Sequence, residues 1–502
     1  MGLSLTVGFS AAVLLFFAAA YPLKLHTITY NPRNRAQRML LCAAVLLCFV
    51  PIVYIFCNLP HESVLYPFQG LLENQNGYEQ QFDAFFKGQL HLDFVPDARI
   101  TALENPYDPA ARAETGAWYP WDRALFGGKY YSYFGIAPLL TVYLPYFALT
   151  YALPAPQTVC FVLAAVGAVA VALLVLRLVH LFVPDCNFCA LLLAIFAAVS
   201  GSLLYMVQAS SDMYYIAVQS GITHLALFLL FAFCAYKQPK TEKAVVCLII
   251  SALNLVLTVL SRPNMALYAV LTVPIFLCIF FGKDSTRLQN AVKLLSFTVP
   301  ALLGAAGVMW YNFARFGSVF EFGATYQLTV CDVSQYHLSG ALLLPALYHY
   351  FFQFPAWKTA FPYLTLTFES FPQKTGYLYV ARMLGVFSMP SFAGIVLFPA
   401  TFGKRKECVK FFTFTLACVC CFALAFLDTC LGGICVRYLA DIAPVLAVFS
   451  GVILLDLQTL FSKNKLGVQY AVFVVVCLLF LLTAAVGVLL IFENERNFLL
   501  TP

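Results

Sequence analysis

The sequence has little charge. Only 10% of its 502 residues are charged, and 62% are hydrophobic. A soluble domain has about 25% charged residues and an apolar share of about half, so this composition excludes a soluble globular protein. It predicts a polytopic membrane protein.

Several short catalytic motifs are also missing. The sequence contains no glycine-rich phosphate loop, no HExxH motif and no Ser/His/Asp series, so nucleotide hydrolysis and membrane zinc proteolysis have no support. Its 17 cysteines lie mostly within apolar runs, where a thiol packs as a small hydrophobic group. The formal charge of +6 comes from basic residues in short loops, which set membrane orientation and do not indicate nucleic-acid binding.

Long apolar runs dominate what is present. A helix of about 17–25 apolar residues crosses a bilayer core of roughly 30 Å. Runs of this kind lie at 7–22, 39–57, 135–153, 158–182, 188–208, 219–236, 243–261, 266–282, 290–311, 383–402, 409–427, 438–456 and 468–492. We therefore expect an all-α membrane protein with about 12–13 transmembrane helices, in which residues 1–502 form a single domain.

The distribution of charge predicts which loops are external. Short loops rich in lysine and arginine remain in the cytoplasm, and such clusters lie near 24–38, 237–243, 283–287 and 404–406. Segment 58–134 instead carries an excess of acidic residues and follows the first cluster by one helix. We expect 58–134 and 312–382 to be the two long external loops.

One apolar run is expected not to cross the membrane. Four crossings between Phe134 and Lys237 would return the chain to the wrong side. The run 135–153 follows the first external loop directly and is interrupted by prolines, so we expect it to be re-entrant. This choice places Asp212 outside.

Both external loops are expected to contain helices near the membrane surface. Glu79 and Asp83 are four residues apart and share one face of a helix predicted at about 77–87. The aromatic stretch 341–354 is too short to span and is expected to lie along the interface. An external aspartate that meets a substrate hydroxyl can act as a general base. The alternative is that these acids simply solvate the loop.

Three arginines fall at the external ends of helices, where the positive-inside rule does not require them. They are Arg262, Arg315 and Arg437. Arginine is well suited to bidentate contact with phosphate, and together the three favour an anionic substrate. The alternatives are snorkelling side chains or a structural ion pair, such as Arg437 with Asp441.

Two further polar residues lie near or within apolar runs. Asp212 must face water, a partner or an ion, so it is a candidate second acid or metal ligand, with an ordinary loop aspartate as the alternative. His224, within an apolar helix, is more typical of a packed, hydrogen-bonded histidine than of a ligand.

Several stretches resemble a known superfamily. They are FDAFFKGQL, GGKYYSYFGIAPLL, VLSRPN, YNFARFGSVFEFGATYQL and VRYLADIAPVLAV. Together with the helix layout they resemble the GT-C integral-membrane glycosyltransferases, in particular bacterial relatives of the protein O-mannosyltransferases and the aminoarabinose transferase. The sequence departs from the better-known members because it lacks their adjacent Asp-Glu pair. It has Asp83 with Glu79 one turn away.

The resemblance implies a polyprenyl-phosphate sugar donor and inverting transfer on the outer face of the cytoplasmic membrane. The acceptor would be a cell-envelope glycan, lipid or protein. A lipid donor needs no nucleotide-binding domain. No cofactor is required by this interpretation, and a divalent cation remains open.

The resemblance also implies roles for individual residues. Asp83, near Glu79, would be the general base, and Arg437 would hold the lipid phosphate in the same pocket. Arg262 or Lys129 would assist Arg437. Further substrate contacts would come from Trp118, Trp121, Tyr130, Tyr131, Tyr133 and Tyr438 as aromatic surface, and from Asn105 and Asp122 as hydrogen-bonding groups.

Three other functions remain open on the sequence alone. A transporter or flippase would also use arginines and external carboxylates, but it usually has internal repeats and charged or broken helices at the midplane. A glycan polymerase or ligase would share the lipid-phosphate substrate. A noncatalytic membrane subunit is disfavoured by the concentration of Trp, Tyr, Asp and Asn in 105–134.

Overall fold

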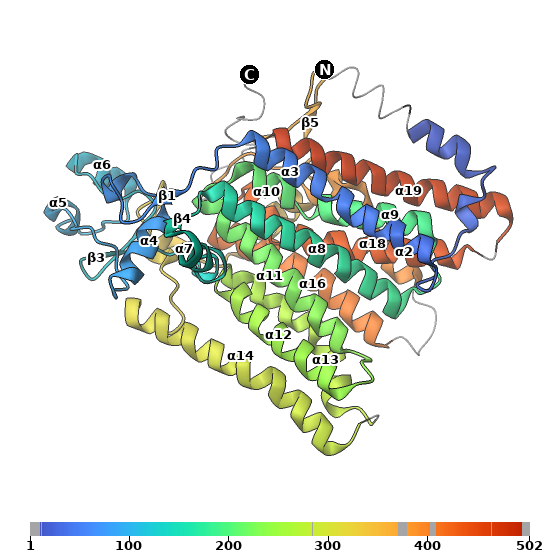
Figure 1. Ribbon diagram of the computed structural model, residues 1–502. Helices are drawn as coiled ribbons and strands as arrows, with labels where there is room; N and C mark the ends of the chain where they lie inside the picture. The colour runs from blue at the N-terminus through green and yellow to red at the C-terminus, as the bar shows by residue number, and fades with distance from the viewer. Residues whose placement is uncertain are drawn as a thin grey trace.

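The computed structural model describes residues 11, 13–283, 285–369, 379–401, 408–462 and 464–493. Within these residues ten helical segments are long and apolar enough to cross a membrane. They are α2 (Arg35–Leu47) with α3 (Phe49–Asn58), α8 (Pro156–Phe182), α9 (Phe188–Gly201) with α10 (Leu204–Ser210), α11 (Met213–Ala235), α12 (Thr241–Val259), η4 (Pro263–Thr272) with α13 (Val273–Phe281), α14 (Arg287–Phe316), α16 (Cys408–Leu431), α18 (Ala443–Leu460) and α19 (Leu466–Leu489). They form a bundle (Figure 1), so the chain is a multi-pass helical membrane protein.

Ten spans are fewer than the thirteen apolar runs, for two reasons. Two of the runs fold as shorter helical segments, Leu139–Thr150 and Pro390–Thr401. The first run, 7–22, lies partly outside the described residues. The stretch Gly340–Phe352 is also too short to span, as expected.

The first of these short segments returns to the side from which it came. It consists of η3 (Leu139–Tyr143) and α7 (Leu144–Thr150). The following strand β4 (Ala152–Leu153) pairs antiparallel with β1 (Val64–Leu65) of the first loop. Because both flanks of the segment meet the same loop, the expectation that it does not cross is confirmed.

The first loop begins with a helix whose start is fixed by a capping box. In α4 (Gly77–Phe86), the Asn76 side chain accepts from the backbone N–H of Glu79, and Glu79 accepts from the backbone N–H of Asn76. The predicted helix is therefore present. Its apolar side chains Tyr78 and Phe82 are buried against the re-entrant segment and Phe134, which orients the rest of the helix.

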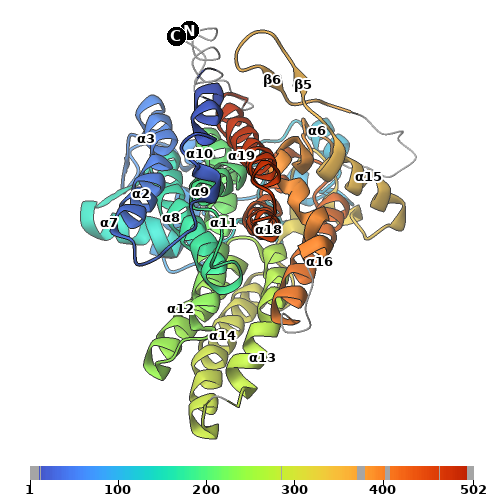
Figure 2. The same ribbon diagram turned by 90° about the vertical axis from the view of Figure 1, so that its right-hand side faces the viewer.

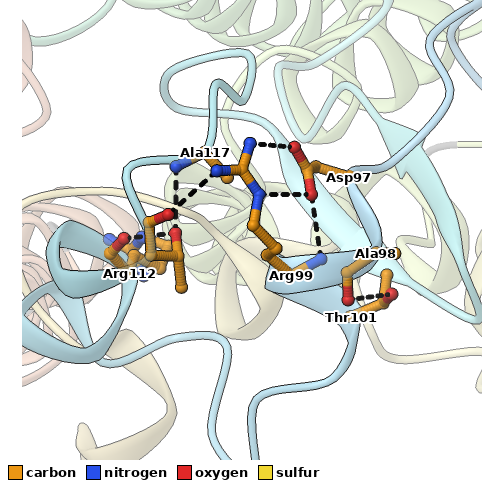
Figure 3. A network of polar contacts seen from close by, with 7 residues as sticks. Asp97, Ala98, Arg99, Thr101, Arg112 and Ala117 are labelled. Carbon is orange, nitrogen blue, oxygen red and sulfur yellow. Dashed lines mark hydrogen bonds and ion pairs between the residues drawn. The ribbon is translucent and has the colours of Figure 1, made fainter.

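A polar network holds the outer part of this loop together (Figure 3). It joins α5 (Ala98–Thr101) to α6 (Pro109–Thr115). Arg99 donates to both carboxylate oxygens of Asp97, at 3.1 and 2.7 Å, and to the carbonyl of Thr115 at 3.1 Å. The guanidinium of Arg99 holds the pKa of Asp97 below its usual value.

A hairpin leads from the loop back to the bundle. Strands β2 (Ala124–Phe126) and β3 (Lys129–Tyr131) pair antiparallel. Gly127 and Gly128 connect them with φ angles of 57° and 70°. A two-residue turn with positive φ at both positions matches the twist of a hairpin, which explains the Gly-Gly pair in this sequence.

The second loop joins the first to form one cap over this end of the bundle. The Leu328 backbone donates to Arg123 at 2.9 Å and accepts from Asp122 at 3.1 Å. Arg112, buried in α6, donates to the carbonyls of Pro106 and Thr329. Smaller elements of the second loop are η5 (Ala324–Tyr326), η6 (Val333–Gln335), η7 (Gly340–Leu342), α15 (Leu343–Leu347), η8 (Tyr348–Phe352), β5 (Ala356–Trp357) and β6 (Leu364–Thr365).

The helices differ strongly in how much of their surface is buried. The most apolar stretch of α11 is 89% buried, whereas that of α14 is 11% buried. Figure 2 shows α12, α13 and α14 projecting from the rest of the bundle. The apolar outer face of α14 is therefore suited to lipid contact, while its last turns approach the cap.

Candidate functional site

Two adjoining cavities lie where the bundle meets the cap. The larger, of about 460 Å³, is lined mainly by the ends of membrane helices, and we call it the helix-lined cavity. The smaller, of about 280 Å³, is lined mainly by the two loops, and we call it the loop-lined cavity. The residues that line both are Tyr133, Tyr214, Gln327, Leu431, Gly432, Arg437 and Tyr438. These shared residues form the boundary between the two.

Close approach of the first loop to the bundle shapes this boundary. Gly135 lies against the backbone of Leu260, and a Cβ at this position would collide with the Leu260 carbonyl. The backbone N–H of Ala137 donates to the same carbonyl at 3.1 Å. The absence of a side chain at Gly135 therefore allows the loop to reach the helix ends that carry Arg262.

Arg437 occupies the boundary between two aromatic rings. Its guanidinium carbon lies 4.8 Å from the ring centroid of Tyr214 and 5.1 Å from that of Tyr438. It donates to the Tyr438 hydroxyl at 3.3 Å. Among the described residues it forms no ion pair. The alternative interpretation that Arg437 pairs with Asp441 is wrong, because Asp441 pairs with Arg262.

Arg262 belongs to a buried polar cluster at one wall of the helix-lined cavity. It forms an ion pair with Asp441, which is fully buried. Asn264 donates to Asp441 at 2.8 Å and to Asp428 at 2.7 Å. The positive charge of Arg262 is thus largely balanced within the protein. Arg437 has no carboxylate partner of this kind among the described residues.

Arg315 supports the wall of the same cavity. Its guanidinium donates to the Ser132 carbonyl at 2.8 Å and to Asn312 Oδ1 at 3.0 Å. Its carbon atom Cζ lies 3.7 Å from the ring centroid of Tyr311. These contacts tie α14 to the end of strand β3, so Arg315 lines the cavity but is held by protein groups.

Asp122 is one of two acids in the wall of the loop-lined cavity. Its backbone is in the left-handed region, with φ 54°, and one carboxylate oxygen accepts from the Tyr214 hydroxyl. The other, Oδ1, is buried without a hydrogen-bond partner among the described residues. The neighbouring Arg123 donates to Gln80 at 2.8 Å and anchors this turn on α4. A buried, half-satisfied carboxylate at a cavity wall is a candidate functional group.

Asp212 lies beside Asp122 in the wall of the loop-lined cavity. Its carboxylate accepts from the backbone N–H groups of Tyr214 and Tyr215, at 2.8 and 3.2 Å. This makes it the N-cap of α11. Capping accounts for an aspartate at this position, and its place at the cavity keeps it as a candidate binding group.

Asp83 and Glu79 lie elsewhere. Asp83 accepts from the Tyr66 hydroxyl at 3.1 Å and pairs with Lys87 at 2.8 Å, and neither acid lines a cavity. The predicted convergence of Asp83 with Arg437 is therefore not found. The capping box of α4 and the burial of Phe82 fix which face of the helix points toward the protein interior. In this orientation Asp83 points toward Tyr66.

The other predicted residues fall into two groups. Trp121, Tyr133 and Tyr438 each line at least one of the two cavities, and so do the three arginines, Arg262, Arg315 and Arg437. The side chain of Asn105 instead donates a hydrogen bond to Asp332 at 2.8 Å. Tyr130 is buried in the protein, and this burial raises the pKa of its hydroxyl to about 12. The predicted binding residues that line neither cavity are Asn105, Trp118, Lys129, Tyr130 and Tyr131.

Sequence reasoning missed Asp428 and Asn264 as site residues. Asp428 lies near the end of α16 within an apolar run, and an ionisable residue at such a position is by itself a functional signal. Asn264 directly follows the predicted Arg262 block and had no distinguishing pattern. In the part of the chain that the structure describes, no group of three or more His, Cys, Asp or Glu side chains is arranged to hold a metal ion.

Comparisons with known proteins give only distant matches. No family model and no curated protein matches the sequence. Among solved structures, the chain is similar to ArnT from Cupriavidus metallidurans bound to undecaprenyl phosphate, with 10% identity, 89% of this chain and 76% of that chain covered, and a TM-score of 0.40. Apo ArnT from the same organism is 12% identical to this chain, with 88% of this chain and 76% of that chain covered and a TM-score of 0.40. The apo oligosaccharyltransferase from Archaeoglobus fulgidus is 13% identical to this chain, with 91% of this chain and 56% of that chain covered and a TM-score of 0.45.

The chain thus spans just over half of the oligosaccharyltransferase, at 56%, and about three quarters of ArnT, at 76%. Identities and TM-scores at this level carry no argument about activity. The function has to be argued from the two cavities and the residues between them.

Proposed function

We propose that this protein is a membrane glycosyltransferase that moves a sugar from a polyprenyl-phosphate donor to an acceptor on the outer face of the cytoplasmic membrane. The observation that carries the proposal is the position of Arg437 on the boundary between the two cavities. It is held by aromatic rings and forms no ion pair among the described residues. A guanidinium kept in this way is suited to binding a phosphate.

The helix-lined cavity is suited to the donor. Its wall includes the apolar side chains of Ile136, Val259, Val308 and Leu427, which fit isoprene units. The cavity is bounded by the last turns of α14, whose outer face is available to lipid. A lipid-borne phosphate could thus reach Arg437 from the membrane, and the guanidinium fork would contact two phosphate oxygens.

The loop-lined cavity is suited to the acceptor, with Asp122 as the general base. We assign this role to Asp122 in place of Asp83, because Asp122 lines the cavity that also contains Arg437, and one of its carboxylate oxygens has no hydrogen-bond partner among the described residues. A positioned base of this kind contributes about 10²–10⁴-fold to a rate.

The reaction then follows from the arrangement. The acceptor oxygen attacks the anomeric carbon of the sugar, and its proton passes to Asp122. The bond between that carbon and the phosphate oxygen breaks, and its electron pair leaves with the polyprenyl phosphate. Arg437 stabilises the negative charge that develops there. Attack from one cavity and departure into the other occur on opposite faces of the sugar, so the configuration inverts.

Donor turnover tests this proposal. Purified protein in lipid is incubated with a panel of polyprenyl-phosphate sugars, with and without candidate acceptors. We expect acceptor-dependent consumption of one donor, release of the lipid phosphate, and a product of inverted anomeric configuration by NMR. Movement of intact donor across the bilayer without consumption would instead identify a flippase. Transfer of a whole oligosaccharide in one step would identify a ligase.

A further inference from the structure

We infer that the acceptor is a glycan chain, whose terminal sugar hydroxyl enters the loop-lined cavity. This inference rests on the proposed function and adds the class of acceptor, which the donor chemistry leaves open. Four features of the cavity support it, namely its aromatic wall, its hydrogen-bonding groups, its surroundings and its size.

The wall combines aromatic rings with carboxylates and an amide. The rings of Trp121, Tyr336 and Tyr379 line the cavity together with Asp122 and Gln327. A sugar ring has an apolar C–H face that packs on an aromatic ring, and hydroxyl groups at its edge that donate to carboxylates and amide oxygens. This combination fits a sugar better than an apolar ligand, which offers no hydrogen bonds to these polar groups.

The unpartnered oxygen of Asp122 needs a hydrogen-bond donor. It is 6% exposed as a residue, and Oδ1 has no partner among the described residues. The charged side chains that line this cavity are Asp122, Asp212 and Arg437. Two carboxylates and one guanidinium leave one net negative charge, which accommodates either a hydroxyl or an amine as the acceptor group. The binding test below distinguishes the two.

Aromatic side chains continue outside the cavity. The rings of Trp121 and Tyr119 are stacked with centroids 6.3 Å apart, and those of Trp118 and Phe94 lie 5.8 Å apart. Trp121 is 47% exposed and Trp118 is 51% exposed. Two exposed tryptophans within four residues on one loop offer a surface along which further sugar units of a chain can pack.

The size of the cavity disfavours a folded protein surface as the acceptor. Its volume of about 280 Å³ lies just below the range of small-molecule sites, which begins at about 300 Å³. It therefore admits the end of a chain and not a folded surface.

Binding without donor provides the first test. The full-length protein in lipid nanodiscs is titrated with three probes, namely short oligosaccharides, Ser/Thr-containing peptides and alkyl amines, and intrinsic tryptophan fluorescence is recorded. We expect oligosaccharides to bind and to bind more tightly as the chain lengthens. Binding of the peptides or amines but not of the oligosaccharides would overturn the inference.

Variants locate the site. Trp121→Ala should weaken oligosaccharide binding about tenfold, the effect of losing one aromatic stacking contact, and Trp121→Phe should restore most of it. The matched control is Trp357→Ala, because Trp357 is 63% exposed on β5 and lines neither cavity. If both alanine variants bind equally well, measured by NMR saturation transfer on folded protein, the loop-lined cavity is not the glycan site.

The outcome is distinguishable from failure of the proposed function. Glycan binding that depends on Trp121, without consumption of any lipid-linked sugar, would keep the glycan site and overturn the transferase. Donor consumption that depends on a peptide acceptor would keep the transferase and overturn the glycan acceptor.

Discussion

Asp122 and Arg437 contact the same side chain from two sides. The hydroxyl of Tyr214 donates to the Asp122 carboxylate, and its ring centroid lies 4.8 Å from the Arg437 guanidinium carbon. One tyrosine thus separates an acid with an unpartnered oxygen from a guanidinium without an ion pair among the described residues. The proposed base and the proposed phosphate site thus share one neighbouring side chain, and the following experiments test that arrangement.

Replacing Asp122 should remove the base without removing the side chain. We expect Asp122→Asn to lower the initial rate of transfer by about 10²–10⁴-fold, the usual contribution of a general base. Asp83→Asn is the matched control in the same loop and should keep most of the activity, because Asp83 is paired with Lys87 away from both cavities. Loss of activity in Asp83→Asn alone, with normal yield, would return the base role to Asp83.

Replacing Arg437 should mainly affect use of the donor. Arg437→Ala removes charge-assisted hydrogen bonds of about 1.5–3 kcal/mol, so kcat/KM for the lipid donor should fall by about 10- to 150-fold. Arg437→Lys should recover only part of this loss, because an ammonium cannot form the bidentate contact. Donor titrations at saturating acceptor measure the effect. An unchanged donor KM together with a lower protein yield would favour a structural role.

Arg262 should matter for stability more than for donor binding. Arg262→Ala leaves the fully buried Asp441 without its ion-pair partner, so we expect a loss of about 3–5 kcal/mol. The double variant Arg262→Ala with Asp441→Ala should be less destabilised than Arg262→Ala alone. Arg99→Ala, which breaks an exposed pair with Asp97 and one exposed hydrogen bond to Thr115, is the control and should lower the unfolding midpoint much less than Arg262→Ala. Additive effects in the double variant would contradict this interpretation.

Glu79 should give the protein a pH-dependent stability. Burial raises the pKa of Glu79 above its ordinary value of 4.5, partly offset by its hydrogen bond from the Asn76 backbone. For an acid with a raised pKa, the stabilising contribution is present below the unfolded pKa and is lost as pH rises through the folded pKa. Stability should therefore fall above pH 4.5, by at most about 1.4 kcal/mol per pH unit.

Glu79→Gln tests this dependence, because glutamine retains the capping interaction and cannot ionise. Thermal unfolding midpoints in detergent, measured between about pH 4 and pH 8, should decline less with rising pH in the variant. Parallel curves for the two proteins would show that Glu79 does not titrate in this range.

Adding one methyl group at Gly135 should disturb the boundary between the cavities. The new Cβ would collide with the Leu260 carbonyl, so Gly135→Ala should cost about 1–3 kcal/mol and reduce transfer. Gly70→Ala is the control in the same loop, since nothing lies within 4 Å of its added Cβ. Equal activity and stability of the two variants would mean that the backbone can move aside without consequence.

The sequence predicts the membrane helices well, because long apolar runs leave few alternatives to a spanning helix. It also predicts the re-entrant segment, since the alternation of basic loops requires one run not to cross. It does not predict that Pro390–Thr401 forms a short 3₁₀ segment beside α18, because apolar composition alone does not distinguish it from a full span.

Site residues are harder to predict, because their positions depend on contacts distant in sequence. Arg262, Arg315 and Arg437 are predicted from the charge pattern and Tyr133 from the family resemblance, and all four line the helix-lined cavity. Asp83 looks like the loop acid from its helix and its neighbours, yet packing of Phe82 turns it away. Asp122 lies in a turn whose backbone pairs with Leu328, more than 200 residues later in the chain.

The backbone pairing of Leu328 with Asp122 and Arg123, together with the Arg112 contacts to Thr329, joins two stretches of chain that are far apart in sequence. A protease cut in either stretch would leave the fragments associated, and activity could survive the nick. For the same reason, exchanging one of these stretches for a segment of different length would break the pairing. A working chimera has to exchange both together.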